Sequence, residues 1–192
     1  MAKKLNRVRG AGFRLFNIGG RFKDKPDGKK EVSKITYKGT LIAVKDIEKA
    51  KAFYKSVLDL DVIMDAGANV QLTGNLFLQT VDTWTSFINR TESKIVFSNN
   101  AIELYFETND MDSFIEKLKS LADIEYIHPP MEHSWGQQAV RFYDLDKHII
   151  EVAESLAVVI RKFIDSGLAI EQTATRMGVD SGYIKSVLGQ TK

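Results

Sequence analysis

The residues in this chain that could carry out acid–base or metal chemistry are carboxylates placed inside apolar, strand-like segments. Glu103 begins such a segment, and Tyr105 and Glu107 share its face because side chains alternate along a strand. Glu151 follows a second apolar run. A buried carboxylate without a partner is costly, so Glu103 either serves a ligand cavity or forms a salt bridge with Arg141.

A loop before the last strand-like segments carries two further candidates. His133 could reach a cavity and shuttle a proton near neutral pH, because imidazole titrates in that range. Trp135, next to Gly136, is expected over the cavity mouth, although an aromatic residue at such a position also serves packing. His148 lies at a turn, where we expect a structural role.

Several kinds of chemistry are excluded by residue content. The chain has no cysteine, which excludes disulfides, thiolate–zinc sites and cysteine nucleophiles. It contains no glycine-rich phosphate loop after a strand, no Gly-x-Ser-x-Gly and no His-Glu-x-x-His. We therefore predict no organic cofactor site.

The candidate residues must be positioned by a pattern that occurs twice. Thr40–Asp46 reads as a strand that runs into the amphipathic helix Ile47–Leu58, and Ile102–Asp110 runs in the same way into the helix Met111–Leu118. In both copies an aspartate stands at the junction, where it is a good helix N-cap. Two copies of one supersecondary unit bury their apolar faces together, so we expect a ligand cavity at the seam.

Each copy continues with short strand-like runs, which predicts an α+β fold of two βαβββ modules. The modules cover residues 35–81 and 100–154, within one domain at 35–154. The expected strands lie at 35–45, 60–64, 69–73, 76–81, 101–108, 124–128, 138–143 and 148–153. Pro129-Pro130 is expected to end the sixth of them.

Residues 155–192 predict a helical tail. Glycines separate three helical stripes, and the Ala174-x-x-x-Gly178-Val179 spacing is typical of a helix-turn-helix. The third stripe has few basic side chains, whereas DNA binding needs charge that neutralises phosphates, so nucleic acid is not the expected partner. Packing on the sheet or on a second subunit is expected instead.

Charge sets the first segment apart. Residues 1–34 hold eleven Lys and Arg against three Asp and Glu, whereas the rest of the chain has 16 basic and 22 acidic side chains. This predicts a flexible basic arm, which could bind an anionic partner, be a transit peptide or have no specific role. No apolar run reaches the roughly 18 residues of a membrane span, and no secretory signal is found, so we expect a cytoplasmic protein without membrane contact.

Residues 36–154 resemble the vicinal oxygen chelate superfamily of glyoxalases, bleomycin-resistance proteins and dioxygenases. Leu41–Leu58 is similar to the opening strand and helix of that superfamily, including the pair Phe53-Tyr54. Trp135–Val152 is similar to its closing strands. The resemblance implies that the two modules form a half-open barrel around a shared cavity.

In metal-using members of the superfamily, four inward strand positions hold a divalent metal that acts as a Lewis acid. The first position of each module lies seven residues before the capping aspartate, which is Gly39 in one module and Glu103 in the other. The last position falls on Glu151, and the remaining one falls near Gln79. The resemblance thus implies a divalent metal on Gln79, Glu103 and Glu151, with Gly39 as a departure because it has no side chain.

Three functions are compatible with the resemblance. One is a glyoxalase-type lyase or isomerase, in which Glu103, Glu151 or His133 moves a proton on a small carbonyl or vicinal-oxygen substrate. Another is a metal-free, homodimeric binding protein of the bleomycin-resistance type, which would hold an aromatic or cationic small molecule. The third is a regulator that senses a ligand and uses the helical tail. The cavity residues would be Glu103, Tyr105, Glu107, Trp135 and Arg141.

Overall fold

The computed structural model describes residues 34–189. The predicted basic arm at 1–34 lies outside the described residues apart from Lys34. The second of the two units into which the chain divides begins at Tyr37, and it contains both modules and the helical tail. None of the described helices is both long enough and apolar enough to cross a membrane.

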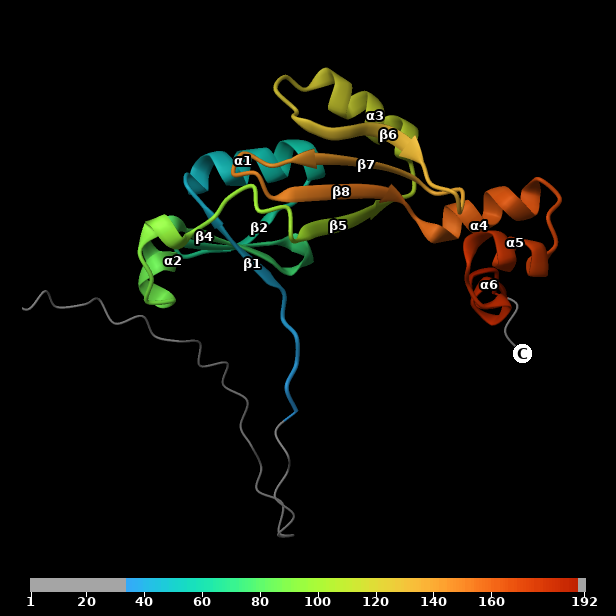
Figure 1. Ribbon diagram of the computed structural model, residues 1–192, viewed down its shortest axis with the longest axis horizontal. Coiled ribbons are helices and arrows are strands. Elements are labelled where there is room, and N and C mark those ends of the chain that lie inside the picture. The colour runs from blue at the N-terminus through green and yellow to red at the C-terminus, as the bar shows by residue number, and fades with distance from the viewer. Residues whose placement is uncertain (1–33, 190–192) are drawn as a thin grey trace, which may run out of the picture. The chain divides into compact units, whose positions relative to one another are not determined.

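Both predicted modules are present (Figure 1). The first consists of β1 Thr40–Val44, α1 Ile47–Leu58, β2 Val62–Asp65, β3 Asn69–Leu72 and β4 Leu76–Thr80. The second consists of β5 Glu103–Thr108, α3 Met111–Ser120, β6 Tyr126–Glu132, β7 Gln138–Tyr143 and β8 Ile149–Glu154. The strand orders are β1-β4-β3-β2 and β5-β8-β7-β6. The α+β fold is confirmed, and the described strands form two four-stranded sheets rather than a closed barrel.

The first helix of each module begins at the predicted aspartate. The side chain of Asp46 accepts a hydrogen bond from the backbone N–H of Lys49 at 3.1 Å, and that of Asp110 accepts one from Ser113 at 3.0 Å. Each cap satisfies an N–H group that has no partner within the helix, and is worth about 1 kcal/mol. The caps therefore fix the residue at which each helix begins after its strand.

One apolar core joins the two modules. Tyr54 of α1 is fully buried, and its hydroxyl donates a hydrogen bond at 2.7 Å to Asp144, in the turn between β7 and β8. In the same turn Asp146 accepts a hydrogen bond from the backbone N–H of Lys45 at 3.1 Å. Burial alone would raise the pKa of Asp144, but His148 and Tyr54 donate hydrogen bonds to it, and these hold its pKa below the ordinary value.

Three local features differ from expectation. β1 begins at Thr40 rather than at residue 35. β6 continues through Pro129-Pro130, because it is an edge strand and its pairing with β7 shifts register between His128 and Met131, where the missing N–H groups are not needed. A helix that was not expected, α2 Val81–Phe87, follows β4 directly.

The predicted helical tail is present as three helices that begin where β8 ends (Figure 1). They are α4 Leu156–Asp165, α5 Ile170–Met177 and α6 Ser181–Val187. They share a small apolar core of their own, and Gly178 ends α5 in the left-handed conformation (φ 68°). On α6 the basic side chain is Lys185, and Lys162 of α4 is paired with Glu154. That nucleic acid is not the partner stays a prediction.

Candidate functional site

The predicted acidic residues lie on the face of the second sheet that is turned away from the core. In β5, Leu104 belongs to the core, whereas Glu103, Tyr105 and Glu107 are exposed on the other face. Glu151 of β8 lies directly beside Tyr105 in the parallel ladder. Strand alternation therefore gathers the predicted side chains on one face, as the sequence indicates.

Arg141 of β7 lies between the two glutamates that were predicted to bind a metal. Its Nε is 3.1 Å from Glu103 Oε2, and its Nη2 contacts Glu151 Oε2. The Glu151 side chain is 6% exposed, so its charge depends on this contact. His128 Nε2 lies 3.2 Å from Arg141 Nη1. The salt bridge between Glu103 and Arg141, one of the two roles considered for Glu103, is formed. Arg141 also pairs with Glu151.

Burial raises the pKa of Glu151 above its ordinary value. The positive charge of Arg141 acts in the opposite direction without cancelling the effect, and the neighbouring Glu103 adds to the rise. Positive charge on His133 or His128 would lower the pKa. Glu151 is thus a buried carboxyl group that keeps its proton to a higher pH than a solvated glutamate does.

A chain of hydrogen bonds fixes the aromatic residues of the same face. Trp135 Nε1 donates to Gln137 Oε1 at 2.9 Å, and Gln137 Nε2 donates to the Tyr105 hydroxyl at 3.3 Å. The Tyr105 hydroxyl donates to Glu107 Oε1 at 2.8 Å, and burial together with this bond raises the pKa of Tyr105 to about 12. Gln137 was not predicted from the sequence; it is buried, and its Nε2 also donates to the Glu154 carbonyl at 2.7 Å.

His133 stacks on Trp135, with ring centroids 4.3 Å apart and planes 9° from parallel. Its Nε2 is buried and has no hydrogen-bond partner among the described residues. The backbone N–H of His133 donates to the Gln137 carbonyl at 2.9 Å, which closes the loop. Its role as a proton shuttle stays a prediction.

The first module differs at the corresponding positions. The ladders pair Leu41 with Phe77 and Tyr105 with Glu151. Because Leu41 and Tyr105 each lie five residues before their capping aspartate, Phe77 corresponds to Glu151. The residue predicted from the sequence for this position, Gln79, lies two residues further along β4. The correction follows from strand pairing, which a residue count across the turn at Gly74-Asn75 does not determine.

Gln79 is buried within the first module and has partners there. Its Oε1 accepts a hydrogen bond from Asn69 Nδ2 at 2.7 Å, and its Nε2 donates to the Thr83 hydroxyl. Gly39 has no room for a ligating side chain. A Cβ at this residue would lie 2.0 Å from the Asn75 carbonyl oxygen and 2.8 Å from the Phe77 ring.

These residues do not fit a divalent metal as they are arranged. A metal needs several oxygen or nitrogen donors converging on one point. The guanidinium of Arg141 already occupies the space between Glu103 and Glu151, and Phe77 and Gly39 supply no donor side chain. Among residues 34–189, no group of three or more His, Asp or Glu side chains could hold a metal ion.

Comparison with known proteins agrees with this architecture. The family model described as the glyoxalase-like domain matches residues 37–157. A solved protein of unknown function from Agrobacterium tumefaciens is 30% identical, with a TM-score of 0.58, and the match covers 64% of this chain and 96% of that one. Among curated proteins, none matches the sequence.

Two more distant solved structures share the fold. A glyoxalase/bleomycin resistance protein/dioxygenase from Nocardioides is 18% identical over 65% of this chain and 86% of that one, with a TM-score of 0.54. A family enzyme from Burkholderia phytofirmans is 16% identical over 61% and 96%, also with a TM-score of 0.54. Because the family model matches residues 37–157, more than half of the sequence, the chain belongs to the glyoxalase-like domain family.

Proposed function

We propose that this chain binds a cationic aromatic small molecule without a divalent metal. The site is the face of the second sheet that is turned away from the core and carries Glu103, Tyr105, Glu107, Arg141 and Glu151, called the charged face below. The observation that carries the proposal is the position of Arg141 between Glu103 and Glu151. Arg141 supplies the positive charge that a metal would otherwise supply. The glutamates of this face outnumber its one arginine, so a cation is the ligand that its charge favours.

The aromatic residues of this face suit the flat part of such a ligand. Tyr105 is 50% exposed and Trp135 is 36% exposed, and both are held in place by the hydrogen bonds through Gln137. A cation over an aromatic ring gains about 0.5–2 kcal/mol, depending on how far it is desolvated. Glu107 is exposed beside Tyr105 and is available to pair with the ligand charge.

The test is a pair of tricyclic probes of similar shape. Proflavine is cationic near neutral pH, and acridine is neutral there. Calorimetric titration of the full chain is expected to show tighter binding of proflavine. Glu103→Gln and Glu107→Gln should each weaken proflavine binding roughly fivefold, the equivalent of about 1 kcal/mol. Glu116→Gln, an exposed change on α3, is the matched control and should have no effect.

Equal affinity for the two probes would contradict the proposal, and so would unchanged proflavine binding in both glutamate variants. Dialysis against a chelator should leave the affinity of the unmodified chain unchanged. We also propose that the chain works as a homodimer, which sedimentation of the full chain tests. If the chain sediments as a monomer and still binds proflavine as expected, the proposal of a homodimer is wrong and the proposal of the binding site stands.

A second candidate function is proton transfer on a small carbonyl compound. It is supported by the raised pKa of the buried Glu151 and by the buried, unpartnered Nε2 of His133. Deuterium exchange into hydroxyacetone, followed by NMR in the presence of a chelator, is its test. Exchange that disappears in Glu151→Gln would support this function, and exchange no faster than in buffer would remove it.

A further inference from the structure

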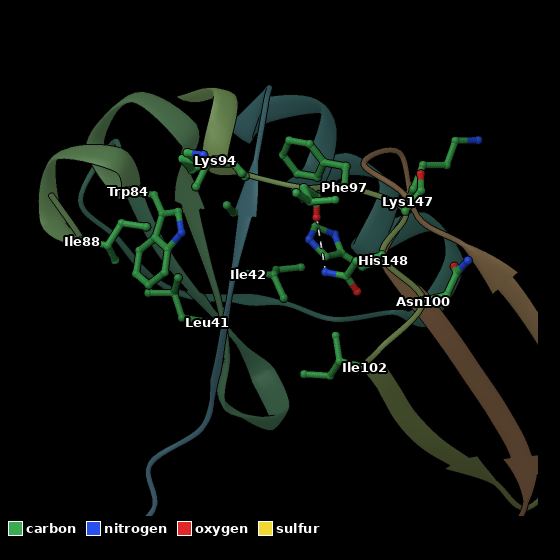
Figure 2. A pocket seen from close by; sticks show the side chains of 15 residues that line it. Leu41, Ile42, Trp84, Ile88, Lys94, Phe97, Asn100, Ile102, Lys147 and His148 are labelled. Atoms are coloured by element: carbon green, nitrogen blue, oxygen red, sulfur yellow. Dashed lines mark hydrogen bonds between the residues drawn. The ribbon is translucent and has the colours of Figure 1, made fainter. Parts of the chain in front are cut away.

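A second pocket lies outside the charged face, along β1 of the first module. Its volume is about 340 Å³, and none of Glu103, Arg141 and Glu151 lines it. It is bordered by β1, by α2, by the segment 94–102 between the modules and by the turn between β7 and β8 (Figure 2). Small-molecule sites are typically a few hundred Å³ in volume, with mostly apolar walls and a few polar groups.

The walls of this pocket are apolar on two sides. Leu41 of β1, Trp84 of α2 and Ile88, which follows α2, lie together on one side, and Phe97 lies on the other (Figure 2). Leu41, the second residue of β1, is 36% exposed, which leaves apolar area for a ligand to cover. A flat or branched apolar group of modest size would fit between these side chains.

The charged side chains that line the pocket carry positive charge. They are Lys94 and Lys147, joined by the titratable His148, and no carboxylate lines it. Lys147 is paired with Glu125, and its amino group points away from the pocket in Figure 2. Lys94 forms no ion pair with any residue in 34–189. It is therefore available to an anion.

His148 presents a fixed ring to the same space. Its Nδ1 lies 2.9 Å from Asp144 Oδ2, and its ring meets Phe97 edge to face at 5.9 Å. A proton on Nδ1 is held by the Asp144 carboxylate, so Nε2 donates a hydrogen bond to a ligand carboxylate when the ring carries its second proton. Within the described residues Nε2 makes no hydrogen bond. The nearest acidic groups, Asp144 and Asp146, are compensated by His148, Tyr54 and Lys45.

We propose that this pocket binds a small amphipathic monocarboxylate, with its apolar part between Trp84, Leu41 and Phe97 and its carboxylate at Lys94 and His148. This site goes beyond the function proposed above, because its ligand has the opposite charge and the pocket has none of Glu103, Arg141 and Glu151 in its lining. A cation is disfavoured by the positive charge of Lys94 in the pocket lining. A wholly apolar molecule would leave the pairing capacity of Lys94 and His148 unused.

The experiment uses two probes of similar shape, naphthylacetic acid, which is an anion near neutral pH, and naphthylacetamide, which is neutral. Calorimetric titration of the full chain should show the acid binding roughly fivefold to tenfold more tightly, since a charge-assisted hydrogen bond is worth about 1 kcal/mol or more. Lys94→Glu should remove this preference. Lys119→Glu, an exposed change on α3, is the matched control and should retain it.

Tryptophan fluorescence locates the site. Binding of the acid should quench emission of the unmodified chain, and most of this quenching should be lost in Trp84→Phe, which leaves Trp135 as the remaining tryptophan. Quenching that persists in Trp84→Phe would place the ligand elsewhere and overturn the proposal. Equal binding of acid and amide, or no binding of the acid, would also overturn it.

The two proposed sites can fail separately. Glu107→Gln should weaken proflavine binding and leave binding of the acid unchanged, whereas Lys94→Glu should do the reverse. If one of these variants lost binding of both proflavine and the acid, the two ligands would share one site. That result would overturn the proposal of a separate monocarboxylate pocket. Circular dichroism of each variant checks that the chain remains folded.

Discussion

The two modules share one backbone plan and carry opposite chemistry on the sheet faces turned away from the core. Counted from the capping aspartates and along the ladders, five positions correspond. They pair Gly39 with Glu103, Leu41 with Tyr105, Ala43 with Glu107, Gln71 with Arg141 and Phe77 with Glu151. Every charged member of the set belongs to the second module.

The core faces of the same strands show no such divergence. Leu76 and Leu78 of β4 correspond to Ile150 and Val152 of β8, and all four are buried in the common core. Close packing restricts a buried position to side chains of similar size and polarity. The comparison shows that packing constrains one face of a duplicated sheet and leaves the other free to take on separate binding properties.

The contrast between the outer faces of the two modules is tested most strongly by substituting Arg141. Arg141→Met leaves Glu151 buried without its cation, so the free energy of unfolding should fall by about 3 kcal/mol. Urea unfolding measures this loss. Gln71→Met, at the corresponding position of the first module, should cost less than about 1 kcal/mol because no buried charge depends on Gln71. Equal losses in the two variants would contradict the assignment of Arg141 as the partner of Glu151.

Gly39 and Glu103 give the next largest contrast. Gly39 has φ 146°, and a Cβ there would collide with the Asn75 carbonyl, so Gly39→Ala should cost about 2 kcal/mol. Glu103→Ala removes an exposed carboxylate and should cost under about 1 kcal/mol. Thermal unfolding of both variants is the measurement. A Gly39→Ala protein as stable as the unmodified chain would show that this position could accept a ligating side chain.

The fold itself was largely predictable because its main signals are local. Two alternating runs, each followed by an aspartate and an amphipathic helix, required no knowledge of distant contacts. Helix α2 was missed because Val81–Phe87 is short and rich in β-branched and aromatic residues, which favour strands. The continuation of β6 through two prolines depends on its edge position, and only strand pairing reveals that.

The candidate site was predictable only in part. Alternation placed Glu103, Tyr105 and Glu107 on one face, and Arg141 was foreseen as a partner of Glu103. That Arg141 also reaches Glu151, and that Phe77 replaces Gln79 as the counterpart of Glu151, follow from ladder registers between distant segments. The pocket beside Trp84 could not be foreseen, because it depends on how the segment 94–102 folds back along β1.

A smaller contrast concerns the contact that joins the modules. Tyr54→Phe removes the hydrogen bond to the buried Asp144 and should lower the free energy of unfolding by about 1.5 kcal/mol. Tyr37→Phe is the control, because the Tyr37 hydroxyl bonds only to Thr40 at an exposed site. It should change stability by under about 0.5 kcal/mol. No difference between the variants in urea unfolding would mean that the Tyr54–Asp144 hydrogen bond does not help to hold the modules together.

The smallest effect is on pH dependence. Since the pKa of Glu151 is raised in the folded state, the folded protein keeps a proton there that the unfolded chain has already lost. Its contribution to stability is present at low pH and falls as the pH rises from the ordinary value of 4.5 through the folded-state pKa. Glu151→Gln should therefore gain stability relative to the unmodified chain over that range. A relative stability that does not change with pH would contradict the raised pKa.

The central claim is that Arg141, and not a divalent metal, is the positive charge placed between Glu103 and Glu151 of the second sheet. Equilibrium dialysis of the full chain with nickel and manganese ions tests it most directly. The expected result is that no metal is retained at micromolar concentration and that Glu103→Ala changes nothing. Stoichiometric retention of either metal, lost in Glu103→Ala, would contradict the claim.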